Sequence, residues 1–213
     1  LQYAMDSGKS RQQAMDEMTE ECLVSNEKAQ LAMQIADIQK GLLADLEPRD
    51  FSLYVSIPYC PSRCSYCSFV SHSIDHPKAR KLLPEYLDFL VKEIAFTANL
   101  SCEMGLRLRS VYIGGGTPTA LTAEQLRQVT DAVREHFDPP ENLEYTIEAG
   151  RADTITPEKL QVIRDAGANR ISINPQTFED SVLEAVGRRH TANQVVECYQ
   201  LARGYGFEAI NMD

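Results

Sequence analysis

The chain has 213 residues, of which 43% are hydrophobic and 24% are charged, and its formal net charge is −10. This length and composition are ordinary for a soluble globular domain and exclude a disordered chain. No segment approaches the roughly 18 uninterrupted apolar residues of a membrane span, and the N-terminus lacks the pattern of a signal peptide. The acidic balance argues against a nucleic-acid partner, since such proteins present a basic face. We therefore expect a cytoplasmic protein with no membrane span.

The first 48 residues are expected to form a segment of their own. Residues 12–46 are acidic and helix-prone, and Pro48 breaks this pattern. Apolar side chains recur at helical spacing at Leu31, Ile35, Ile38 and Leu42. We expect one or two helices packed ahead of the main domain. The chain begins at Leu1 and ends inside an apparent strand, which indicates a fragment.

From residue 49 onward, strands and helices are predicted to alternate. The expected strands are 53–57, 110–113, 143–149, 170–174 and 208–213. The expected helices begin near Pro84, at a capping box of Thr122 and Gln125, and at Thr156, with shorter ones at 180–186 and 192–205. Strands joined by single crossover helices predict a parallel sheet, with functional groups where strands end. An open barrel and a doubly wound sheet both fit this pattern.

Three of the six cysteines lie together in the loop after the first expected strand. Cys60, Cys64 and Cys67 have the spacing Cys-x3-Cys-x2-Cys. Thiolates are soft ligands, and a short loop can place three of them around three corners of an iron–sulfur cluster, which leaves one iron without a protein ligand. Because His72 and His76 lie nearby, a zinc site is the alternative. The other cysteines, at positions 22, 102 and 198, have no partner pattern and are expected to be ordinary thiols.

Two motifs accompany the cysteine loop: YVSIPYC at 54–60 and GGGTPT at 114–119. With the cysteine spacing they resemble the radical S-adenosylmethionine (SAM) superfamily. More narrowly, they resemble the oxygen-independent coproporphyrinogen III oxidase family, including its coproporphyrinogen dehydrogenase (HemZ-type) branch and the related haem chaperones. The resemblance runs from about residue 50 to the last residue. It implies an α/β fold: a partial (β/α)6 radical SAM barrel at 49–213, truncated after about five strands and preceded by the helical segment at 1–48.

The resemblance also implies the cofactors and their contacts. Cys60, Cys64 and Cys67 would hold a [4Fe–4S] cluster, and the open iron would be chelated by the methionine part of SAM. The reduced cluster then cleaves SAM to a 5′-deoxyadenosyl radical, so the cofactor carries the reactive centre and no side chain is assigned a catalytic role. The residues that match SAM-binding positions are Tyr54, Tyr66, Gly115, Gly116, Thr117, Glu148, Gln176, Arg188 and Asp213.

Most of these positions also have an ordinary structural interpretation. The three glycines fit a strand-to-helix turn, the two tyrosines fit a core, and Glu148 fits an exposed surface. Arg188 and Asp213 fit simple salt bridges. His190 fits a ligand for a porphyrin carboxylate or a haem iron, but a histidine at the start of a helix is more commonly structural.

In the resembled oxidase family, the radical abstracts hydrogen from the β-carbon of a propionate, and loss of CO2 and one electron leaves a vinyl group. Two such steps convert coproporphyrinogen III to protoporphyrinogen IX. The best-known bacterial oxidases carry a further cysteine two residues beyond the third ligand, whereas Ser68 and Phe69 follow Cys67 here. The dehydrogenase branch and the haem chaperones share this departure.

The segments at 148–151 and 171–177 resemble the dehydrogenase branch more closely. The sequence therefore predicts an anaerobic coproporphyrinogen III oxidase of that branch, with a tetrapyrrole substrate and an electron donor such as flavodoxin or ferredoxin. A haem chaperone is the alternative, and another radical SAM reaction such as methyl transfer stays open because one half-barrel serves many chemistries.

Overall fold

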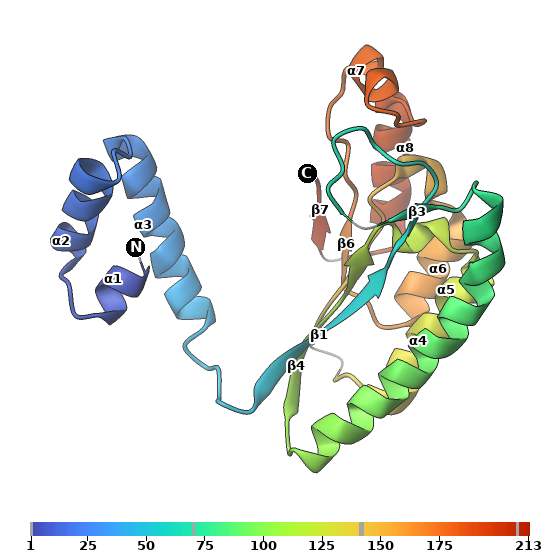
Figure 1. Ribbon diagram of the computed structural model, residues 1–213, viewed down its shortest axis with the longest axis horizontal. Helices are drawn as coiled ribbons and strands as arrows, with labels where there is room; N and C mark the ends of the chain where they lie inside the picture. Colours follow the sequence, from blue (N-terminus) through green and yellow to red (C-terminus); the bar gives the residue numbers. More distant parts are fainter. Residues whose placement is uncertain (1, 70, 141–142, 208) are drawn as a thin grey trace. The chain divides into compact units, whose positions relative to one another are not determined.

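The computed structural model describes residues 2–69, 71–140, 143–207 and 209–213. It divides into two compact units, Leu1–Pro48 and Arg49–Asp213 (Figure 1). Each unit has a buried apolar cluster of its own, small in the first and extensive in the second. No helix within the described ranges is long and apolar enough to cross a membrane.

The first unit is built from short helices. They are α1 (Gln2–Asp6), α2 (Arg11–Asp16), the π-helix η1 (Glu17–Glu21) and α3 (Asn26–Leu42). The hydroxyls of Ser10 and Ser25 accept backbone hydrogen bonds at the starts of α2 and α3. These two caps divide a segment for which the sequence predicted only one or two helices.

The predicted apolar stripe of α3 is exposed in this unit. Between 46% and 71% of the surface of its four members is exposed, namely Leu31, Ile35, Ile38 and Leu42. The face that α3 buries carries Ala29, Met33 and Ala36 instead. Helical spacing correctly predicted the helix but not which of its faces is buried, because the small side chains of the neighbouring helix α2, such as Ala14, pack against Met33.

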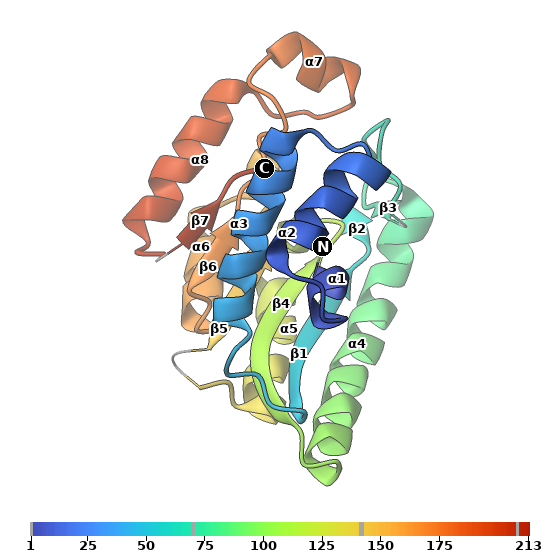
Figure 2. The same ribbon diagram turned by 90° about the vertical axis from the view of Figure 1, so that its left-hand side faces the viewer.

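The second unit contains a five-stranded parallel sheet. Its strands are β1 (Asp50–Ile57), β4 (Arg107–Gly115), β5 (Glu144–Glu148), β6 (Arg170–Ser172) and β7 (Ala209–Asn211). They lie side by side in the order β1-β4-β5-β6-β7, which Figure 2 shows from one face. Each new strand adds to the same edge, whereas a doubly wound sheet reverses direction at a switch point. The order therefore gives a partial barrel, the first of the two folds that fit the sequence pattern.

Helices connect successive strands and cover one face of this sheet (Figure 1). They are α4 (Pro77–Glu103), α5 (Ala123–Phe137), α6 (Pro157–Asp165), the short α7 (Asp180–Ala185) and α8 (Ala192–Gly204). The predicted capping box of Thr122 and Gln125 is present at α5. The start predicted for α4 near Pro84 is wrong, because the helix begins at Pro77 and contains Pro84. Burial of Ala79 and Leu83 in that early turn stabilises it despite the interior proline.

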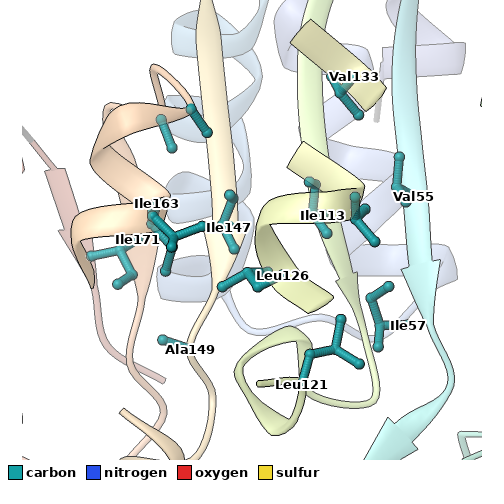
Figure 3. Packing of buried hydrophobic residues seen from close by; sticks show 14 of the residues in the cluster. Val55, Ile57, Ile113, Leu121, Leu126, Val133, Ile147, Ala149, Ile163 and Ile171 are labelled. Atoms are coloured by element: carbon teal, nitrogen blue, oxygen red, sulfur yellow. The ribbon is translucent and has the colours of Figure 1, made fainter. Parts of the chain in front are cut away.

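Alternation along the strands separates an apolar face from a polar one. Ile57, Ile113, Ile147 and Ile171 are completely buried and point toward the helices, where they pack against residues such as Leu126 (Figure 3). Because successive side chains of a strand point to opposite faces, the residues that alternate with these isoleucines along each strand line the other face. That row is polar and includes Tyr54, Tyr112, Glu148, Ser172 and Asn211. It forms the concave side of the partial barrel, opposite the helices.

Candidate functional site

The cysteine loop leaves the sheet at the end of β1 and is closed by two short parallel strands, β2 (Tyr59–Cys60) and β3 (His72–Ser73). The amide of His72 donates to the carbonyl of Pro58 at 2.8 Å, and the amide of Ile74 donates to the carbonyl of Cys60 at 2.9 Å. These bonds hold the two ends of the loop together, so its three cysteines are confined to one short turn of chain.

The loop also docks on the segment that follows α7. The amide of Ser65 donates to the carbonyl of Val186 at 3.0 Å, and the hydroxyl of Ser62 donates to the carbonyl of Gly187 at 2.8 Å. A Cβ atom at Gly187, whose φ is +80°, would lie 3.3 Å from the carbonyl oxygen of Arg63. The cysteine loop is therefore fixed against the loop that carries Arg188.

All three cysteines of the loop are half-buried free thiols. The hydroxyl of Thr117 donates to Sγ of Cys60 at 3.4 Å, and the guanidinium of Arg151 donates to Sγ of Cys64 at 3.6 Å. Such donors stabilise a thiolate, which is the form that binds a metal. Three thiols on one short loop, two of them with donors directed at sulfur, are a donor set that suits an iron–sulfur cluster.

The alternative of a zinc site depends on His72 and His76, and both side chains are exposed. Within the described part of the chain, no three His, Cys, Asp or Glu side chains are grouped so that they could hold a metal ion. This holds for Cys60, Cys64 and Cys67 as well as for the histidines, so cysteine ligation rests on the spacing of the three thiols and on the donors at two of them.

The three glycines at the carboxyl end of β4 pack against the protein's own chain. A Cβ atom at Gly116 would lie 2.7 Å from the carbonyl oxygen of Tyr59 and 3.0 Å from Sγ of Cys60. One at Gly115, where φ is +105°, would lie 2.8 Å from Oγ of Ser56, and one at Gly114 would lie 3.0 Å from the carboxyl carbon of Glu148. The absence of side chains lets β4 end directly beneath the cysteine loop.

The backbone amides of Gly115, Gly116 and Thr117 already have acceptors. The amide of Gly116 donates to Ile57 and that of Thr117 donates to Tyr59, each at 2.8 Å, while the amide of Gly115 donates to the Glu148 carboxylate. The Thr117 side chain is 2% exposed and donates to Cys60. A ligand at this segment would therefore meet carbonyl oxygens rather than free amides.

Glu148, Tyr54 and Asp213 gather around a residue that the sequence did not single out, Tyr112. The hydroxyl of Tyr112 donates to Oε1 of Glu148 at 2.5 Å, and its ring stacks on that of Tyr54 with centroids 5.8 Å apart. Burial and the Asp213 carboxylate raise the pKa of Glu148, while the bonds from Tyr112 and Gly115 lower it, and the net shift is upward. Burial, followed by the Glu148 carboxylate, raises the pKa of Tyr112 strongly.

Tyr66, Gln176 and Arg188 form a second group at the edge of the cysteine loop. The Tyr66 hydroxyl donates to Oε1 of Gln176 at 3.1 Å and accepts from Nε of Arg188 at 3.2 Å. Arg188 also donates to the carbonyls of Gly150 and Asn174, at 3.1 and 2.9 Å. One guanidinium thus joins the cysteine loop to the loops after β5 and β6.

Asp213, the last predicted position, is linked to this group by a backbone hydrogen bond. The amide of Gln176, which has a φ of +65°, donates to the carbonyl of Asp213 at 2.9 Å. The Asp213 carboxylate accepts from the side chain of Asn211 at 2.7 Å. Seven of the nine predicted SAM positions therefore lie at or just beyond the carboxyl ends of strands or in the cysteine loop, whereas Tyr54 lies within β1 and Arg188 follows α7.

Sequence reasoning missed two residues of the site. Tyr112 is in register with Tyr54 on the neighbouring strand, so the tyrosine at the same place in both strands was a usable signal. Arg151 is 2% exposed and contacts Ser62 and Cys64. No local sequence pattern predicts these contacts. His190, considered as a haem or porphyrin ligand, is 2% exposed and its Nδ1 lies 3.7 Å from Oδ1 of Asp153, so its position is structural.

Residues 54–213 match the radical SAM superfamily. Over all of this chain, 38% of residues are identical to the oxygen-independent coproporphyrinogen-III oxidase-like protein HemZ of Bacillus subtilis, of which 43% is covered. Over 76% of this chain, 37% are identical to the haem chaperone HemW of the same organism, of which 41% is covered. The solved structure of coproporphyrinogen III oxidase (HemN) from Escherichia coli superposes with a TM-score of 0.68 at 32% identity, covering 78% of this chain and 37% of that one.

The fold, the cysteine loop and these matches define the class: the chain belongs to the radical SAM superfamily. Within it, the predicted resemblance to the oxygen-independent coproporphyrinogen III oxidase and HemZ group is confirmed. SAM and a [4Fe–4S] cluster, the cofactors that the sequence predicts, are those of this superfamily. The chain spans less than half the length of the relatives named above.

Proposed function

We propose that this chain is the cofactor-binding part of an anaerobic coproporphyrinogen III oxidase of the dehydrogenase type, acting in the cytoplasm on a tetrapyrrole. The observation that carries this proposal is the extent of the match to HemZ, which includes the whole chain and hence the first unit. The match to the haem chaperone leaves about a quarter of the chain without a counterpart, as its 76% coverage states. An N-terminal region ahead of the barrel is a feature of the dehydrogenase branch that the sequence resembles.

The cluster ligands in this proposal are Cys60, Cys64 and Cys67. Their half-buried thiols and the donors at Cys60 and Cys64 support this role. When bound, the cluster and SAM would supply a carbon-centred radical that removes hydrogen from a C–H bond of the substrate. The protein's own contribution is to position the cofactors and the substrate.

The amides of 115–117 are already used, so a ligand at the end of β4 would meet carbonyl oxygens and would have to supply the donors. The amino group of SAM's methionine is such a donor, and the Glu148 carboxylate beside this segment supplies a further acceptor. Arg188 fixes the loops around the same space through the carbonyls of Gly150 and Asn174. Tyr54 and Tyr66, each 54% exposed, offer ring surface for the adenine side of SAM.

A haem chaperone is the second candidate. The 37% identity to HemW favours it, whereas the serine and phenylalanine after Cys67 are compatible with both candidates. The buried position of His190, beside Asp153, removes the one histidine that the sequence offered as a haem ligand. Haem binding by this chain would therefore need other groups.

The experiment that separates the two functions uses the full-length protein, reconstituted anaerobically with SAM, dithionite, an added one-electron acceptor and coproporphyrinogen III deuterated at the propionate β-carbons. An oxidase transfers deuterium to 5′-deoxyadenosine and releases one CO2 for each vinyl group formed. Each decarboxylation leaves one electron, which the acceptor takes up. A Cys64→Ala protein is the control, since any product it forms does not depend on the cluster. Tight haem binding with neither CO2 nor labelled 5′-deoxyadenosine would overturn the oxidase proposal.

A further inference from the structure

Arg151 is a buried cation at the base of the cysteine loop. It follows the end of β5, its exposure is 2%, and its guanidinium reaches a part of the chain 87 residues earlier. Nη2 donates to the hydroxyl of Ser62 at 2.9 Å, and Nη1 donates to the carbonyl of Ser62 at 3.3 Å and to Sγ of Cys64 at 3.6 Å. In the described part of the chain, no other cationic side chain hydrogen-bonds a cysteine sulfur.

The other edge of the same guanidinium faces a carboxylate. Nε of Arg151 lies 3.4 Å from Oδ1 of Asp153, which also lies 3.7 Å from Nδ1 of His190. Burial alone would raise the pKa of Asp153, but the adjacent His190 and the charge of Arg151 outweigh it and lower that pKa. Asp153 is therefore an anion paired with Arg151, whose guanidinium is held by its hydrogen bonds to Ser62 and Cys64.

One carboxylate, Asp153, and the acceptors of the cysteine loop explain why a full positive charge is tolerated here. A buried charge is costly unless it is paired and hydrogen-bonded. The guanidinium of arginine is planar, so its Nε can face Asp153 while its two Nη atoms donate to Ser62 and Cys64. The ammonium of a lysine, on a flexible stem, cannot contact both sides in this way. The guanidinium is thereby fixed with its outer nitrogens directed at the cysteine loop.

We infer that Arg151 is a positioning residue that orients Cys64 and raises the reduction potential of the cluster, which rests on the proposed ligation by the three cysteines. Reduction adds a negative charge to the cluster, and a fixed cation next to a ligand sulfur stabilises the reduced form. Hydrogen bonds to ligand sulfurs shift the potential in the same direction. Asp153 acts in the opposite sense, because its negative charge lies behind the cation.

The test compares midpoint potentials of the full-length, reconstituted protein, measured by redox titration with electron paramagnetic resonance. Arg151→Met removes the cation and its donors, and Asp153→Asn removes the anion behind it. Arg189→Met is the matched control, because Arg189 is exposed, pairs with Asp75 at 2.7 Å and has no cysteine contact. Iron content is measured for every variant. We expect a more negative potential for Arg151→Met, a less negative one for Asp153→Asn and no change for Arg189→Met.

Opposite shifts in the two variants are the result that a merely structural role would not give. If Arg151→Met does not fold, a less negative potential in Asp153→Asn alone supports the inference. Unchanged potentials in Asp153→Asn and in any folded Arg151→Met protein, or shifts of equal sign, overturn it. A wild-type protein that binds no iron–sulfur cluster would instead refute the proposed ligation.

Discussion

The hydroxyl of Tyr112 lies 2.5 Å from Oε1 of Glu148 and donates to it, so that a tyrosine of β4 helps to keep a half-buried carboxylate ionised. Burial raises the pKa of Glu148, as does the nearby Asp213 carboxylate. Tyr112 and the amide of Gly115 counter part of this rise because both stabilise the charged form. The charge on Glu148 thus depends on a neighbour that need not touch a ligand.

Tyr112→Phe is expected to make SAM binding sensitive to acid. Without the hydroxyl, the pKa of Glu148 rises further, so the carboxylate takes up a proton at a higher pH than in the wild type. Below that pKa, binding that needs the anion weakens by about tenfold per pH unit. Equilibrium dialysis of SAM against the reconstituted protein between pH 5.5 and 8 measures this. The weakening should begin at a higher pH in the variant.

Tyr86→Phe is the control for the loss of a hydroxyl. The Tyr86 hydroxyl donates to the carbonyl of Ser56 at 2.5 Å, and burial raises its pKa to about 12, but Glu148 is not among its partners. The affinity of the Tyr86→Phe protein for SAM should depend on pH in the same way as that of the wild type. Identical pH profiles for all three proteins would show that SAM does not require ionised Glu148.

Single substitution of Cys60, Cys64 or Cys67 by alanine is expected to abolish the [4Fe–4S] cluster. Three corners of the cluster need three thiolates, and the loss of one leaves a second iron without a protein ligand. Iron and sulfide analysis with the visible absorption of the reconstituted protein measures this. Cys22→Ala and Cys102→Ala are matched controls, since both thiols are exposed, and they should keep full iron content. Stoichiometric zinc without iron in anaerobically purified protein would contradict the assignment.

Arg188→Ala is expected to weaken SAM binding by an order of magnitude or more while iron content is kept. The variant loses hydrogen bonds to the carbonyls of Gly150 and Asn174 and to Tyr66. Hydrogen bonds to charged groups contribute about 1.5–3 kcal/mol each, so the melting temperature should also fall. Arg189→Ala, at the adjacent exposed position, should change neither binding nor melting. Loss of SAM binding only in proportion to unfolded protein would leave Arg188 with a structural role alone.

The strand and helix order of the second unit was predictable because its signals are local. Alternation places Val55, Ile57, Val111 and Ile113 on one face, and capping residues such as Thr122 mark where helices begin. The first unit was harder to predict, since its buried face depends on which short helices pack together. There Met33 and small alanines outweigh a more conspicuous row of leucines and isoleucines.

The site was predictable where a motif carries it and not where the fold assembles it. Cysteine spacing marks the loop, but nothing in the neighbourhood of Arg151 shows that its guanidinium will meet Cys64, because 87 residues separate them. The order of the strands brings these loops to one edge of the sheet. The glycines illustrate the same limit: the sequence suggested room for a ligand, and the structure shows close contact with Tyr59 and Cys60.

Gly116→Ala is expected to destabilise the protein and to lower cluster content. The new methyl carbon would lie 2.7 Å from the carbonyl oxygen of Tyr59, 2.9 Å from that of Ile57 and 3.0 Å from Sγ of Cys60. Two of these neighbours are backbone atoms that cannot rotate away, and Gly116 itself donates to Ile57 at 2.8 Å. The strand end must therefore move away from β1 and β2, which carries Cys60 out of place.

Overpacking of this kind costs about 1–3 kcal/mol, and each kcal/mol corresponds to about 2–4 °C of melting temperature in a domain of this size. Thermal unfolding of the apo protein and iron content after reconstitution measure the two effects. Gly204→Ala is the matched control, because Gly204 ends α8, a Cβ atom there meets nothing within 4 Å, and alanine favours a helix over glycine. That variant should melt at or slightly above the wild-type temperature with unchanged iron. If Gly116→Ala matched it in both measurements, the close approach of β4 to the cysteine loop would not be a requirement of the site.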